Sequence, residues 1–318
     1  YPPPSPQIKR DVLKIAISFP DSPPRLYEIN QKTSLKNNIS EFCKAWSIPD
    51  PHDYALQVSD SQLYITEENR HEVRDGSLLN LTTAPWKAAE SLMRQIRKPE
   101  TAEGKVAALM KISKLSADPT FSEEFIRHKG VEWIVSSVEK GTLQVGRLRW
   151  CWGESLAYAL TAFLEVMDHA IISWEQALNK EFIKKIANYV NKTSETDATI
   201  LQRSLGILEC AVVNSHALYQ EISDAITIGN LLTHLQNLNC GLYAISLFFV
   251  MMCLFMKSPS DTGKKISDSM AQKQIRTVIL NHVIRTQRAI GSKMAHQLYV
   301  LQVLTFNLLE ERMMCKLD

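Results

Sequence analysis

The residue pattern of this 318-residue chain changes its period near Ala84-Pro85, and this change constrains the fold more than any single motif does. Before it, short runs such as residues 12–19 and 77–82 alternate apolar and polar residues. After it, apolar residues recur at three- and four-residue spacing, which is typical of helices. The sequence therefore predicts an α+β protein with a small strand-containing domain over residues 1–84 and an all-α domain over residues 85–318.

The composition excludes several classes of function. Apolar residues make up 45% and charged residues 22% of the chain, as in ordinary globular proteins. The net charge of +2 predicts no nucleic-acid partner, because that function needs a concentrated basic surface. The six cysteines form no CxxC pair and predict free thiols. Residues 241–256 are strongly apolar but fall short of the roughly 20 residues of a membrane span, so they predict a buried helix.

The first domain shows five short strands and one helix. The expected strands cover residues 12–19, 25–29, 54–58, 63–66 and 77–83, and the helix begins at Thr33 or Ser34. Few chain paths suit this order and size, and the β-grasp (ubiquitin-like) fold of ubiquitin and of Ras-binding domains is one of them.

The second strand is predicted to lie at the edge of the sheet, where unpaired backbone groups can accept a partner strand. Its surroundings are basic, with Lys9, Arg10, Lys14, Arg25, Lys32, Lys36 and Lys44 nearby in the sequence. A basic edge suits the acidic, partly extended switch I of a Ras-like GTPase. On charge alone, a solvated strand with scattered lysines is the simpler interpretation.

The second domain predicts a stack of helices of the armadillo or HEAT type. Long apolar helices are expected at residues 153–168, 198–214, 241–256 and 293–310, whose starts lie roughly 40 to 50 residues apart. Such a stack presents a concave surface to partners. Residues 205–214 and 298–307 align, and both end in an asparagine, which could also simply end its helix. The predicted groove residues are Gln202, Arg203, Asn214, His296, Tyr299 and Asn307.

No pattern of catalytic residues accompanies these domains. Glu165, Asp168 and His169 lie close together, but no HExxH motif supports a metal site, and a histidine at a helix C-terminus is the plainer interpretation. A hydrolase built on these three residues is a remote alternative. The sequence also holds no phosphate-binding loop and no nucleophile elbow. It therefore predicts a protein without catalytic activity, cofactor or metal.

Several long blocks resemble the N-terminal half of the ELMO (engulfment and cell motility) scaffold proteins. These blocks are residues 60–70, 164–169, 172–174, 182–187, 200–205 and 294–310. Two segments depart from the family pattern, at residues 142–153 and 239–256. The resemblance implies a Ras-binding domain for GTP-loaded RhoG or an Arl4-type GTPase, and an armadillo-like stack for adhesion receptor tails. It also implies coupling to DOCK exchange factors, which activate Rac, through later regions absent here.

The combined expectation is a cytoplasmic, non-catalytic adaptor that partners recruit to the plasma membrane. The alternative is an autoinhibitory region whose helical stack contacts later domains of a longer protein. The residues predicted to bind the GTPase are Lys14, Arg25, Tyr27, Lys36, Lys44 and Ile48.

Overall fold

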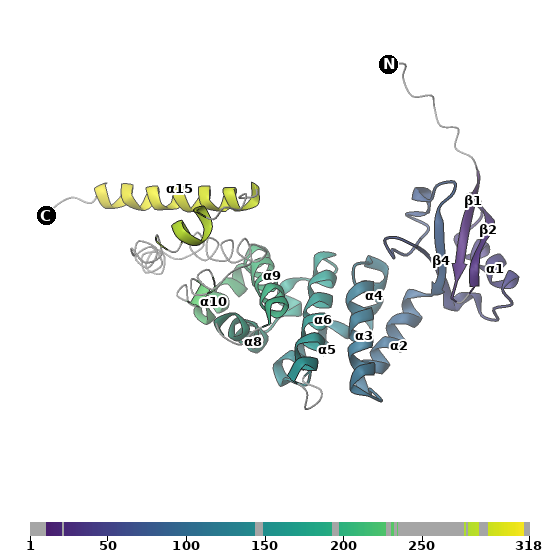
Figure 1. Ribbon diagram of the computed structural model, residues 1–318, viewed down its shortest axis with the longest axis horizontal. Coiled ribbons are helices and arrows are strands. Elements are labelled where there is room, and N and C mark those ends of the chain that lie inside the picture. Colours follow the sequence, from purple (N-terminus) through teal and green to yellow (C-terminus); the bar gives the residue numbers. More distant parts are fainter. Residues whose placement is uncertain are drawn as a thin grey trace, which may run out of the picture. The chain divides into compact units, whose positions relative to one another are not determined.

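The computed structural model describes residues 11–20, 22–143, 149–192, 197–226, 230, 231, 234, 277, 279–285 and 292–314. The chain divides into two compact units, residues 1–131 and 132–318, and each is described by itself (Figure 1). The predicted buried helix at 241–256, the family departure at 239–256, and Lys9 and Arg10 lie outside the described residues. The domain boundary at Ala84-Pro85 stays a prediction.

Unit 1 begins with a four-stranded sheet in the order β2-β1-β4-β3. The strands are β1 (Val12–Phe19), β2 (Ser22–Asn30), β3 (Tyr54–Val58) and β4 (Leu78–Thr83). β1 runs parallel to β4, and the other two pairs are antiparallel. This sheet confirms the predicted strand-containing N-terminal fold, and β2 starts three residues before the predicted position.

One predicted strand is wrong. Residues 63–66 form a single bridge, between Tyr64 and Gln57, instead of a strand. Val58 N donates to Leu63 O at 2.9 Å and Ile65 N donates to Leu56 O at 2.8 Å on either side of this bridge, so the N–H groups of Tyr64 and Thr66 point away from β3. There Asp118 Oδ2 accepts from Tyr64 N and Asn69 Oδ1 accepts from Thr66 N, both at 2.7 Å. The segment therefore folds as a side-chain-bonded loop.

The helix α1 (Leu35–Ala45) covers one face of the sheet. Ser34 caps its first turn by accepting a hydrogen bond from Asn37 N at 3.3 Å. Its apolar side chains, among them Phe42 and Cys43, pack with Ile15, Ile17 and other buried strand residues into the core of the domain. The helix, its cap and its buried face agree with the sequence pattern.

The helix α1 ends in a Schellman motif that lacks the usual glycine. Ile48 N donates to Cys43 O at 2.8 Å and Ser47 N donates to Lys44 O at 3.0 Å. Ser47 occupies the left-handed position with φ of 58°. We expect Ser47→Gly to raise the free energy of unfolding by about 0.5 kcal/mol, because glycine adopts this conformation without steric cost. Urea unfolding followed by circular dichroism measures the change, and a destabilised variant would contradict the explanation.

Three helices complete the described part of unit 1: α2 (Pro85–Arg97), α3 (Ala102–Leu115) and α4 (Pro119–Arg127). The chain passes from β4 into α2 through the single residue Ala84. Ala84 N donates to Asp53 O at 2.7 Å, next to the start of β3. Trp86 Nε1 donates to His52 O at 3.3 Å, and Lys87 forms an ion pair with Asp53. The first turn of α2 is therefore bonded to the loop that precedes β3.

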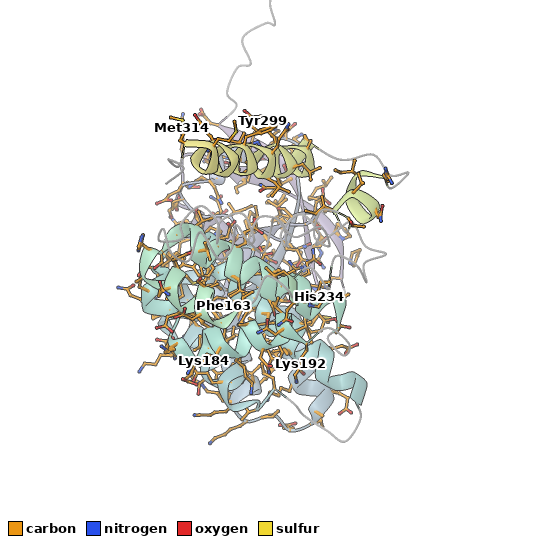
Figure 2. All side chains as sticks on the ribbon, turned by 90° about the vertical axis from the view of Figure 1, so that its left-hand side faces the viewer. Phe163, Lys184, Lys192, His234, Tyr299 and Met314 are labelled. Carbon is orange, nitrogen blue, oxygen red and sulfur yellow. The ribbon has the colours of Figure 1, made fainter. Side chains whose placement is uncertain are left out.

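Unit 2 is helical. It holds most of α5 (Gly130–Lys140), then α6 (Arg149–Asp168), α7 (Trp174–Ala177), α8 (Lys180–Asn191), α9 (Ala198–Asn214), α10 (His216–Ala225), the π-helical turn η3 (Leu280–Ile284) and α15 (Ser292–Met314). α6, α8 and α10 pack against α9. Figure 2 labels Phe163 among these helices, where its ring lies 5.4 Å from that of Phe182. The helices confirm the predicted all-α region, and α9 has the predicted bounds. In the described part of the chain, no helix is long and apolar enough to cross a membrane.

Candidate functional site

The strand β2 lies at the edge of the sheet, as predicted. Gln31 N donates to Asp11 O at 2.7 Å, so these two residues form a hydrogen-bonded pair. Along an antiparallel ladder, hydrogen-bonded pairs alternate with non-hydrogen-bonded pairs. By the register, Ile29, Tyr27 and Arg25 are therefore the residues of β2 that form hydrogen-bonded pairs with β1. The backbone N–H and C=O groups of Leu26 and Glu28 therefore point away from β1, toward the open edge.

Both ends of this open edge are closed. Pro23 and Pro24 have no N–H group to offer an added strand. At the other end, the Asn38 side chain accepts from Asn30 N and donates to Asn30 O, both at 3.2 Å. The edge that a partner strand can use is thus limited to the stretch around Leu26 and Glu28, which we call the open edge.

Arg70 fixes the C-terminal end of β2, at Asn30. It is only 8% exposed, and its Nη2 donates to Asn30 O at 2.9 Å. Its Nη1 pairs with Glu67 Oε2 at 2.6 Å, and the other oxygen of Glu67 accepts from Leu35 N at 2.6 Å. This network joins the loop, the end of β2 and the first turn of α1, so it fixes the edge relative to the helix.

The hydrogen bond from Arg70 is the main reason that the pKa of Glu67 lies below its usual value, and the bond from Leu35 N adds to it. A lowered pKa in the folded state means that the ionised carboxylate stabilises the fold above the ordinary glutamate pKa, and that this contribution is lost as pH falls through the lowered value. We expect Glu67→Gln to reduce the dependence of unfolding free energy on pH in this acidic range. Urea unfolding at a series of acidic pH values measures it, and unchanged dependence would contradict the assignment.

The α1 side of the open edge is aromatic and basic. The Tyr27 ring lies 5.1 Å from that of Phe42 and 5.0 Å from that of Trp46. The Arg25 guanidinium lies 5.4 Å from the centre of the Trp46 ring, within the range of a cation–π interaction. Lys36 and Lys44 are exposed on α1. This side presents positive charge next to a fixed aromatic cluster.

The opposite side of the open edge is different. Because side chains alternate along a strand, Leu26 and Glu28 face away from α1, and Leu26 is 84% exposed. Lys14 lies opposite Glu28 in the register, on this same side. This exposed leucine on an edge strand is a feature of the site that the pattern of charges does not predict.

The structure therefore separates the six residues predicted to bind a GTPase. Arg25 and Tyr27 lie together on the α1 side, and Lys36 and Lys44 are exposed on the helix, whereas Lys14 lies on the other face. Ile48 is half-buried and packs against the core, so only part of it is accessible.

The predicted groove residues fall on two helices of unit 2. Gln202 and Arg203 are half-buried on α9, and the Asn214 side chain donates to Cys210 O at 2.8 Å, which satisfies a carbonyl near the end of its own helix. His296, Tyr299 and Asn307 are exposed on α15, where Figure 2 labels Tyr299. Their spacing places these three on one face of the helix.

Comparison with known proteins decides the family. The model of the ELMO protein N-terminal Ras-binding domain matches residues 11–84, and that of the ELMO armadillo-like helical domain matches residues 120–284. The chain belongs to the ELMO family. The Ras-binding domain of this ELMO chain contains the four-stranded sheet, α1 and the open edge, and the armadillo-like match runs from α4 to η3.

Among its ELMO relatives, engulfment and cell motility protein 1 of Mus musculus is 47% identical over 100% of this chain and 43% of its own length. Engulfment and cell motility protein 2 of Bos taurus is 47% identical over 100% of the chain and 42% of its own length. Protein 3 of Bos taurus is 37% identical over 97% of the chain and 46% of its own length. The chain spans less than half the length of these relatives.

Proposed function

We propose that this chain is the partner-binding region of a non-catalytic adaptor in engulfment and cell motility, and that its Ras-binding domain captures a GTP-loaded small GTPase. The observation that carries the proposal is the open edge, where the backbone groups of Leu26 and Glu28 point away from β1 and a basic, aromatic face lies beside them. An extended GTPase segment would add to β2 through backbone hydrogen bonds.

The chemistry of the two faces specifies what the added segment must carry. Side chains on the α1 side would meet Arg25 and Tyr27, and the positive charge of Arg25, with that of Lys36 exposed on α1, favours acidic residues there. Side chains on the other side would meet Leu26, which favours an apolar residue. An extended segment that alternates acidic and apolar residues therefore fits this edge. The GTP-bound state of switch I in RhoG, or in an Arl4-type GTPase, is the proposed source of such a segment.

The armadillo-like domain is proposed to dock the cytoplasmic tail of an adhesion receptor. Exposed polar and aromatic side chains on α9 and α15, such as Asn214 and Tyr299, support this role. With both partners bound, the adaptor would be recruited from the cytoplasm to the plasma membrane, and coupling to DOCK exchange factors and Rac would depend on further regions.

Calorimetric titration of residues 1–318 with RhoG tests the proposal directly. We expect binding of RhoG loaded with a non-hydrolysable GTP analogue, and much weaker binding of RhoG loaded with GDP. Equal affinity for both forms, or binding to neither, would overturn the effector role. Arl4-type GTPases are titrated in the same way to establish which is preferred.

A further inference from the structure

Unit 2 contains a cleft whose lining includes Asn214, one of the predicted groove residues. It has a volume of about 590 Å³ and lies where α6 and α9 end, at Asp168 and Asn214. The chain leaves α6 through Ala170, which has a positive φ of 54°, and reaches Ser173, which caps α7. We call this space the α6–α9 cleft. Its volume is in the range of sites that take several side chains or a small ligand.

Half of the described residues that line the α6–α9 cleft are apolar. Leu164 and Met167 contribute from α6, and Ile171, Ile172 and Trp174 contribute from the segment that follows. Trp174 is buried and its ring meets that of Phe163 edge-on at 6.0 Å, so this wall is fixed by the core of the unit. A ligand group that enters can bury apolar surface against a rigid partner.

The polar lining of the α6–α9 cleft is acidic. Among the described residues that line it, Glu165, Asp168 and Glu175 are carboxylates, and none is a lysine, arginine or histidine. The C-terminal ends of α6 and α9 add the negative ends of two helix dipoles. A hydrogen bond from Ser215 lowers the pKa of Glu175, so this carboxylate is ionised at neutral pH. Charge complementarity therefore calls for a cation.

The half-buried Cys210 thiol supports this description of the electrostatics. Burial is the main reason that its pKa is raised to about 11, and the negative charges of Glu209 and Asp168 raise it further. Cys210 is therefore a protonated, unreactive part of the lining, which argues against a thiolate nucleophile or a thiolate metal ligand at this place. In the described part of the chain, no cluster of three or more metal-ligating side chains is present.

We propose that the α6–α9 cleft binds a basic side chain, arginine or lysine, of a partner's peptide segment together with a neighbouring apolar side chain. The cation lies between Glu165 and Asp168, and the aliphatic stem and the apolar neighbour lie against Ile172 and Trp174. This inference rests on the proposed docking role of the armadillo-like domain and names the chemistry of its partner. It does not depend on GTPase binding.

A short synthetic peptide tests the proposal on residues 1–318. The probe is a fluorescein-labelled hexapeptide of alternating leucine and arginine, and fluorescence anisotropy measures its Kd. We expect the double variant Glu165→Gln with Asp168→Asn to raise this Kd by about tenfold. The matched control, Glu154→Gln with Asp224→Asn, removes the same charges at exposed positions of α6 and α10 outside the lining and is expected to leave it unchanged. Thermal unfolding verifies that both variants fold.

Two further measurements locate the peptide. Replacing arginine by glutamine, or leucine by serine, in the probe is expected to weaken binding in either case, since both chemistries are required. An unlabelled peptide is expected to change the tryptophan fluorescence, and Trp174→Phe is expected to remove that change. Equal affinity of the two double variants for the probe, or no binding by the unaltered chain, overturns the proposal. The RhoG titration is independent, so its failure would remove the effector role and leave the cleft result standing.

Discussion

Asp118→Ala is expected to lower the free energy of unfolding of unit 1 by about 3 kcal/mol. Asp118 is 2% exposed, and its two carboxylate oxygens serve two different segments. Oδ1 caps α4 by accepting from Phe121 N at 2.9 Å, and Oδ2 accepts from Tyr64 N at 2.7 Å. Alanine removes the cap and also leaves a buried donor at Tyr64 without its acceptor, and the second loss is the larger one.

Urea unfolding measures this effect, and two variants separate its causes. Thr101→Ala removes only an exposed cap, that of α3, where Thr101 Oγ1 accepts from Gly104 N at 2.9 Å, and is expected to cost about 1 kcal/mol. Asp118→Asn keeps one acceptor oxygen and is expected to fall between the two. If Asp118→Ala lowers the free energy of unfolding by no more than Thr101→Ala does, the hydrogen bond between Tyr64 N and Asp118 contributes nothing to stability.

The predictions from sequence succeeded where a local pattern determines the structure. The alternation in residues 12–19 predicted the bounds of β1, because one face of this strand is buried, and the predicted bounds of β3 at residues 54–58 are also confirmed. Ser34 and its apolar spacing placed α1 correctly. The edge position of β2 also followed, from the order of the elements.

The contacts that sequence could not supply are those between distant segments. Asp118 and Tyr64 are 54 residues apart, and their hydrogen bond joins the loop at 63–66, where a strand was expected, to the start of α4. Lys14 carries the same charge as Arg25, yet strand register places the two on opposite faces. Charge counting cannot separate these faces, whereas the pairing of β1 with β2 does. The sequence therefore predicted where on the sheet the candidate site lies, but only some of the residues on its α1 side.

Reversing two charges on the α1 side of the open edge is expected to weaken GTPase binding by about 100-fold or more, because like charges placed across an interface cost several kcal/mol. The variant is Arg25→Glu with Lys36→Glu. It makes acidic the face that is proposed to meet the acidic switch I. Arg25 also loses its contact with Trp46, so the aromatic cluster no longer positions a cation. Calorimetric titration with GTP-loaded RhoG measures the loss.

Two charge changes elsewhere show whether the face matters. Lys111→Glu lies on an exposed part of α3 and is expected to leave the affinity for RhoG unchanged. Lys14→Glu lies on the opposite side of the sheet, across from Glu28, and is expected to change the affinity less than Arg25→Glu alone. Equal losses for Lys14→Glu and Arg25→Glu would mean that the edge responds to total charge. An unchanged affinity in the double variant would mean that the basic face is only solvated, and that any GTPase binds elsewhere.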